Sequence, residues 1–469
     1  MNRTDDDAEL LALVEPYRTK VVEAIRLPTR ADRARLLEEA FYSIVYLKAA
    51  DIYIDLVTDS GTSAMSDRQW AGLLTGDEAY MGSRNFFRLE QTVRDVMGYR
   101  HVIPTHQGRA AENILMELLA EPGDLIASNT LFDTTRAHVL HRGARPLDLV
   151  GDCLWAFGAE QPFKGNVDLE MLQAALEQHH ERMPFLVLTV VNNMAGSAPV
   201  SMENIKETKR LADKFEIPIL FDAARFAENA YLIQQREPAY RDKPIPEIVR
   251  EMFSYGQGCW MSAKKDGLVN IGGFIALNDE GLANRCRERL VLYEGFPTYG
   301  GLARRDLEAM AVGLEEGISE AHLRQRVAQV AHLGDLLSAA GMVVSRPTGG
   351  SGVFVEVDAM YGHLPPEHLP CVAFTCDLYL EGGVRAAAAP FNLARIDPKT
   401  GELGHRVFQI ARFAVPRRVY GQGHMEYVGL VAKRVKEKAH RSLGYRLVHE
   451  PEVLGHFFSK FAPRSGKGD

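Results

Sequence analysis

Short apolar runs alternate with helix-like segments from residue 76 to about residue 313, and this alternation limits the fold more than any other feature of the chain. Two of the runs, residues 185–191 and 217–222, are almost continuously apolar, which is typical of strands buried on both faces. Residues 202–215, between them, are predicted to form a helix. Strands that alternate with helices predict a mostly parallel sheet with right-handed crossovers. Such sheets bind ligands at the carboxyl ends of their strands.

The chain is predicted to divide into three parts: an N-terminal arm at residues 1–57, a large ligand-binding domain at 58–313 and a smaller C-terminal α+β domain at 314–469. The fold class is therefore α/β, with a mostly parallel sheet in the large domain and a smaller α+β domain joined by the arm. Local patterns predict helices at 5–25, 31–46 and 305–340, and strands at 51–57, 353–357 and 407–413.

Composition excludes several classes of protein. The net charge is −8 and no basic stripe is present, so nucleic acid is not an expected partner. The N-terminus has no apolar signal segment, and no apolar run approaches the roughly 20 residues that span a bilayer. Five scattered cysteines without a Cys-x-x-Cys pair suit a reducing cytoplasm and do not indicate zinc. His138 and His141 lack metalloprotease spacing and are interpreted as ordinary helix residues.

Two adjacent lysines, Lys264 and Lys265, separate the apolar run that ends at Ala263 from the run at residues 268–275. A lysine between two core strands is shielded from water, and burial lowers its pKa and makes it nucleophilic toward a carbonyl. This is the chemistry of a Schiff base with pyridoxal phosphate (PLP). A surface turn with two solvated lysines is the alternative that this segment alone leaves open.

Other polar and aromatic residues bear on the lysines. Residues 105–109 lie between a strand and a helix start, where backbone N–H groups and Arg109 favour a phosphate, although a plain helix cap is equally compatible. Asp222 ends a buried strand and needs a partner, which could be a pyridinium N–H or, within the chain, Arg225. The 43 residues from Asp222 to Lys265 allow one crossover, so both are expected at one sheet edge. Phe132 follows a strand and could stack on a flat ring or belong to the core.

Seven strings of residues form a distinctive set in chain order: 56–62, 76–80, 104–109, 222–231, 261–266, 294–301 and 415–420. They resemble the β-eliminating lyases, tryptophanase and tyrosine phenol-lyase, which have the PLP fold type I of aspartate aminotransferase. The resemblance runs from about Glu15 to Phe461. It implies that the large domain binds PLP, that potassium is a second cofactor and that the small-molecule substrate is an amino acid. It also implies a homo-oligomer, a dimer of dimers with active sites at the dimer interface.

The resemblance assigns roles to residues on the cofactor side. Lys265 would hold PLP and move the α-proton, Phe132 would stack on the pyridine, and Asp222 would keep the pyridine nitrogen protonated. Arg225 and Asn193 would contact the phenolate oxygen of the cofactor. The phosphate would be bound by Gln107, Gly108, Arg109 and Ser262.

On the substrate side, the resemblance implies that Arg412 binds the substrate carboxylate with Thr58 and Ser60 beside it. Tyr80 would protonate the leaving group across a dimer interface. Gly61, Glu78 and Asn270 match the potassium site of the family.

The residues expected around the substrate ring mix features of the two subfamilies. Asp133 and His456 are typical of tryptophanase, and we expect them to help the ring tautomerise before it leaves. Residues 85–87 and 416–420 are nearer tyrosine phenol-lyase, but its phenol-binding arginine falls at Ala389, which cannot bind a phenolate. Three further departures are expected to enlarge or remodel the substrate side: Ala388 for a glutamate, Ser197-Ala198 for Gly-Gln, and Val45 for a lid phenylalanine.

The predicted activity is β-elimination from an aromatic L-amino acid, tryptophan or a substituted tryptophan, which yields indole, pyruvate and ammonia. A tyrosine phenol-lyase and a lyase for a modified aromatic or S-substituted amino acid stay open within the class. An aminotransferase or a β-substituting synthase is a different possibility on the same scaffold. A PLP-binding regulator is less compatible, because acid, base and electron-sink residues are all present.

Overall fold

The computed structural model describes residues 15–396, 403–451 and 458–465, and its larger sheet has seven strands. The order is β2-β8-β7-β6-β5-β3-β4. Strand β8 is antiparallel to both of its neighbours and the other pairs are parallel, as a mostly parallel sheet predicts. The strands are β2 (His101–Thr105), β3 (Leu125–Ser128), β4 (Arg145–Asp148), β5 (Leu186–Thr189), β6 (Ile219–Asp222), β7 (Gly258–Ser262) and β8 (Gly273–Leu277).

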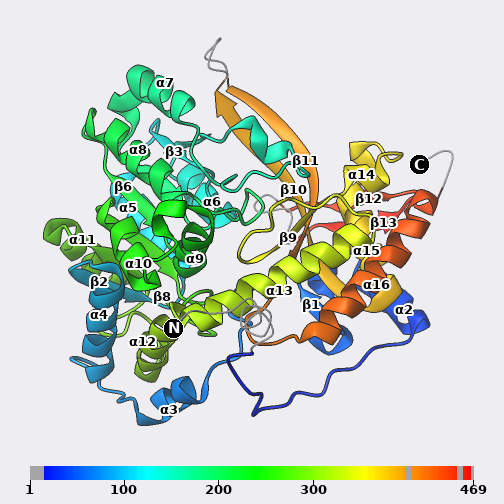
Figure 1. The fold of residues 1–469 in the computed structure, drawn as a ribbon, viewed down its shortest axis with the longest axis horizontal. Helices are drawn as coiled ribbons and strands as arrows, with labels where there is room; N and C mark the ends of the chain where they lie inside the picture. The colour runs from blue at the N-terminus through cyan, green and yellow to red at the C-terminus, as the bar shows by residue number, and fades with distance from the viewer. Residues whose placement is uncertain (1–14, 397–402, 452–457, 466–469) are drawn as a thin grey trace.

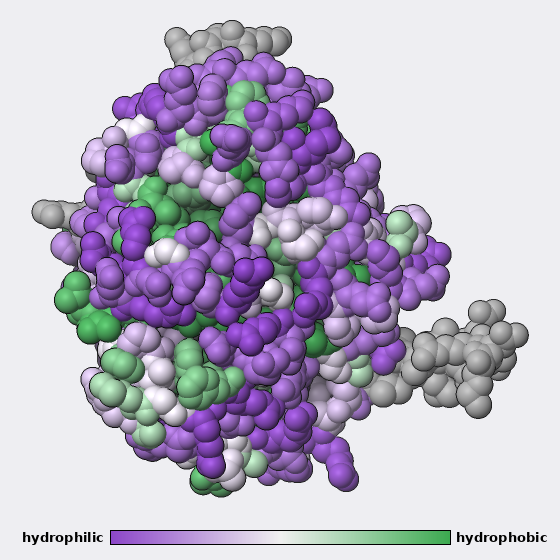
Figure 2. All heavy atoms as spheres, turned by 90° about the vertical axis from the view of Figure 1, so that its left-hand side faces the viewer, coloured by the Kyte–Doolittle hydropathy of each residue, from purple (hydrophilic) through white to green (hydrophobic). Residues whose placement is uncertain are grey.

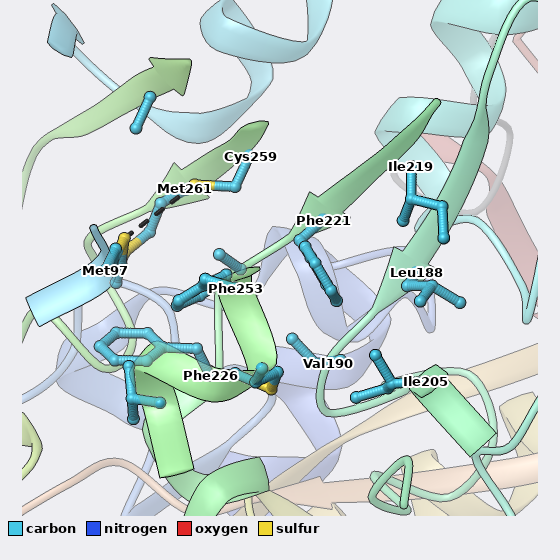
Figure 3. Packing of buried hydrophobic residues seen from close by; sticks show 14 of the residues in the cluster. Met97, Leu188, Val190, Ile205, Ile219, Phe221, Phe226, Phe253, Cys259 and Met261 are labelled. Atoms are coloured by element: carbon cyan, nitrogen blue, oxygen red, sulfur yellow. Dashed lines mark hydrogen bonds between the residues drawn. The ribbon is translucent and has the colours of Figure 1, made fainter. Parts of the chain in front are cut away.

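Successive strand residues point to opposite sides of this sheet, so its apolar strands present apolar side chains on both faces, and helices cover both. Leu220 packs with one set, α5 (Gly108–Leu119), α6 (Asp133–His141) and α11 (Glu280–Tyr293). Phe221 packs on the other side, where its ring lies 5.4 Å from that of Phe253 (Figure 3). The helices on that side are α4 (Arg84–Met97), α7 (Leu169–His179), α8 (Met202–Asp213), α9 (Phe226–Arg236), α10 (Ile245–Ser254) and α12 (Arg304–Gly317), with α3 (Asp67–Thr75) against α12.

The smaller sheet joins the start of the described chain to its C-terminal third. Its order is β1-β10-β11-β9, with β1 (Ile54–Leu56) parallel to β10 (Val384–Ile396). Strand β11 (Leu403–Ala414) pairs antiparallel with β10 and β9 (Gly352–Glu356). The long helix α13 (Glu320–Ala339) crosses from the large sheet to this one (Figure 1). Also present are α2 (Arg30–Glu39), α14 (Asp358–Tyr361), α15 (Pro370–Gly382), α16 (Gln422–Lys438), β12 (Tyr445–His449) and β13 (Lys460–Pro463).

The N-terminal arm differs from its prediction. Residues 5–14 lie outside the described part of the chain, but residues 15–29 do not form the expected helix. The expected helix at 31–46 is shorter, because α2 ends at Glu39 and Phe41 and Tyr42 adopt positive φ. Strand β1 is in place because it hydrogen-bonds to β10, more than 300 residues later. The predicted domain boundaries at residues 57 and 313 stay a prediction.

Polar residues cover most of the face shown in Figure 2, and separate apolar areas interrupt it. Within the described ranges, no helix combines the length and the apolar character that crossing a bilayer requires.

Candidate active site

A pocket opens beside the carboxyl ends of β5, β6 and β7, the edge at which parallel sheets bind ligands. Three strand-end segments and the starts of α5 and α6 contribute its wall. Six of the predicted cofactor residues line it, together with four residues that the sequence did not single out. The lining residues are Glu112, Phe132, Thr189, Val191, Asn193, Asp222, Ala224, Arg225, Ser262 and Lys265.

Lys265 lies in the turn between β7 and β8 and is 9% exposed. Burial, followed by the charge of Arg225, lowers the pKa of its amino group to about 8. Its Nζ lies 5.7 Å from the ring centroid of Phe132. A neutral amine is therefore accessible near physiological pH, as a carbonyl-binding lysine requires.

Lys264 points elsewhere and is less buried. Its Nζ donates a 3.0 Å hydrogen bond to Oε1 of Gln107. The amide of Gln107 also lies 2.8 Å from Nε2 of His106, so its side chain bridges these two residues. The alternative of a surface turn with two solvated lysines is excluded, because Lys264 is hydrogen-bonded and Lys265 is buried in the pocket.

Two buried carboxylates face Lys265. Asp222 ends β6, and its Oδ1 accepts the backbone N–H of Ala224 at 3.2 Å. Glu112 lies on α5, and its Oε2 accepts the hydroxyl of Thr134 at 2.6 Å. Burial raises the pKa of both groups, and the charge of Asp222 helps to raise the pKa of Glu112 to about 7.

Helix α5 begins against the end of β7. A Cβ on Gly108 would lie 2.6 Å from Cβ of Ser262, so only glycine allows this contact. The first backbone N–H groups of α5 therefore start beside the Ser262 hydroxyl, an arrangement that suits a phosphate. Arg109 is exposed on the first turn of the same helix.

Arg225 does not form the internal salt bridge with Asp222 that the sequence left open. It pairs with Asp59 instead, through Nε to Oδ2 at 3.0 Å and Nη2 to Oδ1 at 2.7 Å. Asp59 follows β1, 166 residues earlier in the chain. Asp222 is consequently left to interact with the pocket and with Lys265, whose charge lowers its pKa against the effect of burial.

The predicted carboxylate-binding residues meet above the pocket. Nη1 of Arg412 donates to Oδ1 of Asn193 at 2.9 Å, and Nη2 lies 3.4 Å from the carbonyl oxygen of Val57. Nε of Arg412 is buried without a hydrogen-bond partner among the described residues. The backbone N–H of Ser60 donates to Oγ1 of Thr58 at 3.1 Å in the adjoining turn.

Asp133 lies at the start of α6, and its charge is among those that act on Arg412. Burial lowers the pKa of Arg412, whereas Asp59 and Asp133 raise it. His456, the predicted partner of Asp133, lies outside the described residues.

Tyr80 is not brought to the pocket of its own chain. It is 56% exposed, and its ring lies 5.8 Å from that of Phe296 and 5.4 Å from that of Tyr299.

The three predicted potassium ligands are only partly brought together. Nδ2 of Asn270 donates to the carbonyl oxygen of Gly61 at 3.0 Å. Glu78 instead binds the start of α12, through Arg305 at 2.8 Å and the backbone N–H of Arg304 at 3.1 Å.

Ala388 does not enlarge the substrate side, contrary to the prediction. In the register of β10 and β11, Ala387 pairs with Arg412 and Ala388 pairs with Ala411. Neighbouring strand residues point to opposite faces, and Ala388 packs against the core of the smaller sheet. Ala387 is therefore the alanine on the same face as Arg412, and the backbone of Ala389 pairs with Ile410.

Ser197 replaces a family glycine at a position with φ of 56°, where glycine is favoured. Its hydroxyl shares a 2.6 Å hydrogen bond with the hydroxyl of Ser351, and both side chains are buried. This departure joins the segment after Asn193 to the loop before β9. Val45 is 38% exposed on the N-terminal arm.

Sequence reasoning missed Glu112 and Asp59. Glu112 shares one helical face with the buried Gly108, Leu115 and Met116, so a charged residue at a core position of α5 was the available signal. Asp59 stands between the predicted Thr58 and Ser60, but its partner Arg225 could not be found from local spacing.

The pocket fits PLP on these observations. A lysine of lowered pKa faces an aromatic ring and a buried acid, and a helix start that excludes a Cβ lies at one end. A solved serine palmitoyltransferase from S. paucimobilis, with a bound PLP–myriocin aldimine, has a similar fold. The TM-score is 0.58 at 15% identity, covering 88% of this chain and 97% of that one. Fold and site thus define a PLP-dependent enzyme of fold type I.

Sequence comparison narrows this class to a family. The sequence model of the beta-eliminating lyases matches residues 55–430. A tryptophanase from Salinibacter ruber is 47% identical over 453 residues, 97% of this chain and 96% of the relative. A tyrosine phenol-lyase from Symbiobacterium sp. is 44% identical over 452 residues, 96% of this chain and 99% of the relative. The chain belongs to the β-eliminating lyase family, whose members are PLP-dependent carbon–carbon lyases.

Proposed function

We propose that this lyase acts on an aromatic L-amino acid of the tryptophan type and releases indole or a substituted indole, pyruvate and ammonia. The observation that carries the proposal is the position of Asp133. This carboxylate begins α6 directly after Phe132, which lines the pocket, and its charge acts on Arg412, the residue expected to bind the substrate carboxylate. An indole N–H can donate to such an acceptor, which helps the ring take up a proton at its attachment carbon before it leaves.

The proposed division of labour follows from the electrostatics. Arg412 and the turn at Thr58 bind the substrate carboxylate, which orients the α-hydrogen toward Lys265. The amino group of Lys265, with its pKa lowered to about 8, removes that proton. Bound PLP supplies the electron sink for the electrons left at the α-carbon. Asp222 suits the pyridine nitrogen, because a buried acid needs a partner that carries positive charge.

Tyr80 is proposed to protonate the leaving group in the pocket of a second copy of the chain. Its exposure in one chain supports this role, since it lies away from its own Lys265 pocket. Met81, the next residue in the chain, and Phe87 on α4 are 62% and 55% exposed and add apolar surface to this segment. Exposed apolar side chains gathered near a reactive group are expected at an interface between copies.

Potassium is proposed to bind near Gly61 and Asn270, whose oxygens suit this ion. Glu78 would have to exchange its contact with Arg305 for the cation, or supply its carboxylate to the site of a second copy. The position of Gly61 supports a link to catalysis, because its backbone N–H donates to the carbonyl oxygen of Lys264 at 2.8 Å.

The experiment is to identify the products formed by the PLP-loaded protein from a panel of L-amino acids. Indole and pyruvate from tryptophan are expected to form faster than phenol and pyruvate from tyrosine. Rapid release of phenol would instead assign a tyrosine phenol-lyase. A keto acid that retains the side chain would indicate an aminotransferase, and a new β-substituted amino acid would indicate a synthase.

A further inference from the structure

Asp59 is a fully buried carboxylate that binds two arginines. Its Oδ1 accepts from Nη2 of Arg225, and its Oδ2 accepts from Nε of Arg225 and from Nη1 of Arg417, the last at 3.0 Å. Its exposure is 0%, so water does not compete for these contacts. These arginines hold the pKa of Asp59 well below its usual range despite burial, so the carboxylate is ionised.

Both arginines interact with the loop that carries Lys265. Arg225 lines the pocket, and its charge lowers the pKa of Lys265. Nη2 of Arg417 donates to Oδ1 of Asp266 at 2.9 Å, and Asp266 directly follows Lys265. The other oxygen of Asp266 accepts the backbone N–H groups of Ala227 and Glu228 at the start of α9. The carboxylate of Asp59 is thus connected to Lys265 from two directions.

Asp59 also belongs to the turn that is expected to bind the substrate carboxylate. Thr58 and Ser60 flank it, and Val57 accepts from Arg412. Two residues after Asp59, the backbone N–H of Gly61 donates to the carbonyl oxygen of Lys264. The turn is therefore attached to the lysine loop by its backbone and by the Asp59 side chain.

Asp59 belongs to a network of six buried charged side chains, in which Asp59, Glu228 and Asp266 pair with Arg225, Arg326 and Arg417. The charge of Arg412 also lowers the pKa of Asp59, and burial raises the pKa of Asp266 to about 7. Removing one member of such a group leaves a buried charge without a partner, which is far more costly than losing a surface ion pair. An amide at position 59 would in addition turn its N–H donors toward the N–H donors of at least one guanidinium group.

We infer that Asp59 is a positioning residue that couples the substrate-binding turn to the cofactor pocket by holding Arg225 and Arg417 with one carboxylate. The inference rests on the proposed function only in taking Thr58, Ser60 and Arg412 as the substrate-binding residues. Asp59 does not touch the reacting atoms. It fixes the position of the turn at residues 58–60 relative to Lys265 and compensates the positive charge of Arg225.

Two variants separate these effects. Asp59→Asn keeps the shape and removes the charge, whereas Asp59→Glu keeps the charge and changes the reach by one methylene. Asp148→Asn is the matched control, because Asp148 is equally buried and binds Arg136 through both oxygens at 2.6 and 2.7 Å. Each PLP-loaded protein is titrated with L-alanine, which has the amino and carboxylate groups but no leaving group, and the absorbance is followed. The pH at which the cofactor absorbance changes is measured separately without any amino acid.

Both Asp59 variants are expected to bind L-alanine about tenfold or more weakly, because a small displacement of a positioned group has a large effect. Lys265 is faced by Arg225, Asp59, Asp222 and Glu112, so loss of the Asp59 charge should lower the absorbance midpoint of Asp59→Asn by about one pH unit. Asp59→Glu and Asp148→Asn should keep the wild-type midpoint, and Asp148→Asn should keep wild-type binding.

Wild-type L-alanine binding in a folded Asp59→Glu protein would overturn the inference, and this variant decides the matter if Asp59→Asn does not fold. A loss of binding in Asp148→Asn equal to that in Asp59→Glu would also overturn it, since any buried ion pair would then have the same effect. Neither readout involves elimination, so a wrong leaving group in the proposed function would leave these results unchanged.

Discussion

Nη1 of Arg412, on the smaller sheet, lies 2.9 Å from Oδ1 of Asn193, which follows β5 of the larger sheet. The residue expected to bind the substrate carboxylate is therefore hydrogen-bonded to a residue of the cofactor pocket. Any movement between the two sheets changes this hydrogen bond and, with it, the position of Arg412 relative to the cofactor pocket. Substrate binding therefore depends on the geometry of the pocket.

Arg412→Lys should raise KM for the amino acid by about tenfold or more, because a lysine cannot form the paired contacts that a guanidinium makes with a carboxylate. The decrease in kcat should be smaller. Steady-state kinetics measure both values, and borohydride trapping of PLP serves as the control for an intact cofactor site. An unchanged KM would contradict the role of Arg412.

Borohydride reduction of the yellow PLP-loaded protein should attach the cofactor to Lys265, as peptide mass spectrometry would show. In the apoprotein, the rate of PLP attachment should rise through about pH 8. The pKa of Lys265 is lowered to that value, and only the neutral amine, present above it, attacks a carbonyl. Lys264→Ala should still take up PLP, whereas Lys265→Ala should not be labelled. An adduct on Lys264 would reverse the assignment.

His456→Phe should slow the release of indole from tryptophan far more than elimination from an S-alkyl cysteine. General acid–base assistance is typically worth roughly 10²–10⁴-fold, and a thiolate leaving group requires no protonation of a ring. The S-alkyl cysteine is thus the internal control, and rates for both substrates are measured on one preparation. Equal losses would mean that His456 acts through packing alone.

Activity should be higher in potassium than in sodium at equal ionic strength, and Glu78→Gln should weaken this preference. Arg305→Gln is the matched control, because it breaks the same ion pair from the other side without removing an oxygen ligand. If both variants lost the preference for potassium equally, the Glu78–Arg305 ion pair, and not a cation ligand at Glu78, would be its cause. Equal activity of the wild-type protein in the two salts would rule out a functional cation site.

Acid should destabilise the fold in part through His322. Burial and the charges of Arg418, Arg417 and Arg326 lower its pKa well below the usual 6.5. Below about pH 6.5 the unfolded chain takes up a proton at this residue and the folded chain does not, so stability falls as the pH falls.

His322→Leu should lose less thermal stability than the wild type between about pH 7.5 and about pH 5.5. One such proton contributes up to about 1.4 kcal/mol per pH unit. His141→Gln, at an exposed position, is the control and should follow the wild type. Identical acid dependence in all three proteins would contradict the prediction.

Much of the larger sheet could be predicted from the sequence, because a strand buried on both faces must be apolar along its length. Strand β5 lies within the predicted run at 185–191, and β6 ends at Asp222 as expected. Once strands and crossovers were placed, Asp222 and Lys265 had to meet at one sheet edge. The sequence by itself thus determined the class of fold and the central pair of the site.

Only the tertiary structure decided which charges pair and which faces side chains take. Arg225 binds Asp59 across 166 residues, and nothing in the local pattern separates this partner from Asp222. Ala388 and Arg412 fall on opposite faces because of the register between β10 and β11, which one residue of slippage would reverse. The helix expected at 5–25 does not form over its described residues 15–25, which are exposed except for the half-buried Tyr17, so no packed apolar face stabilises a helix there. Local patterns record the period of burial, whereas the pairing of buried charges depends on chain segments that meet only in the folded protein.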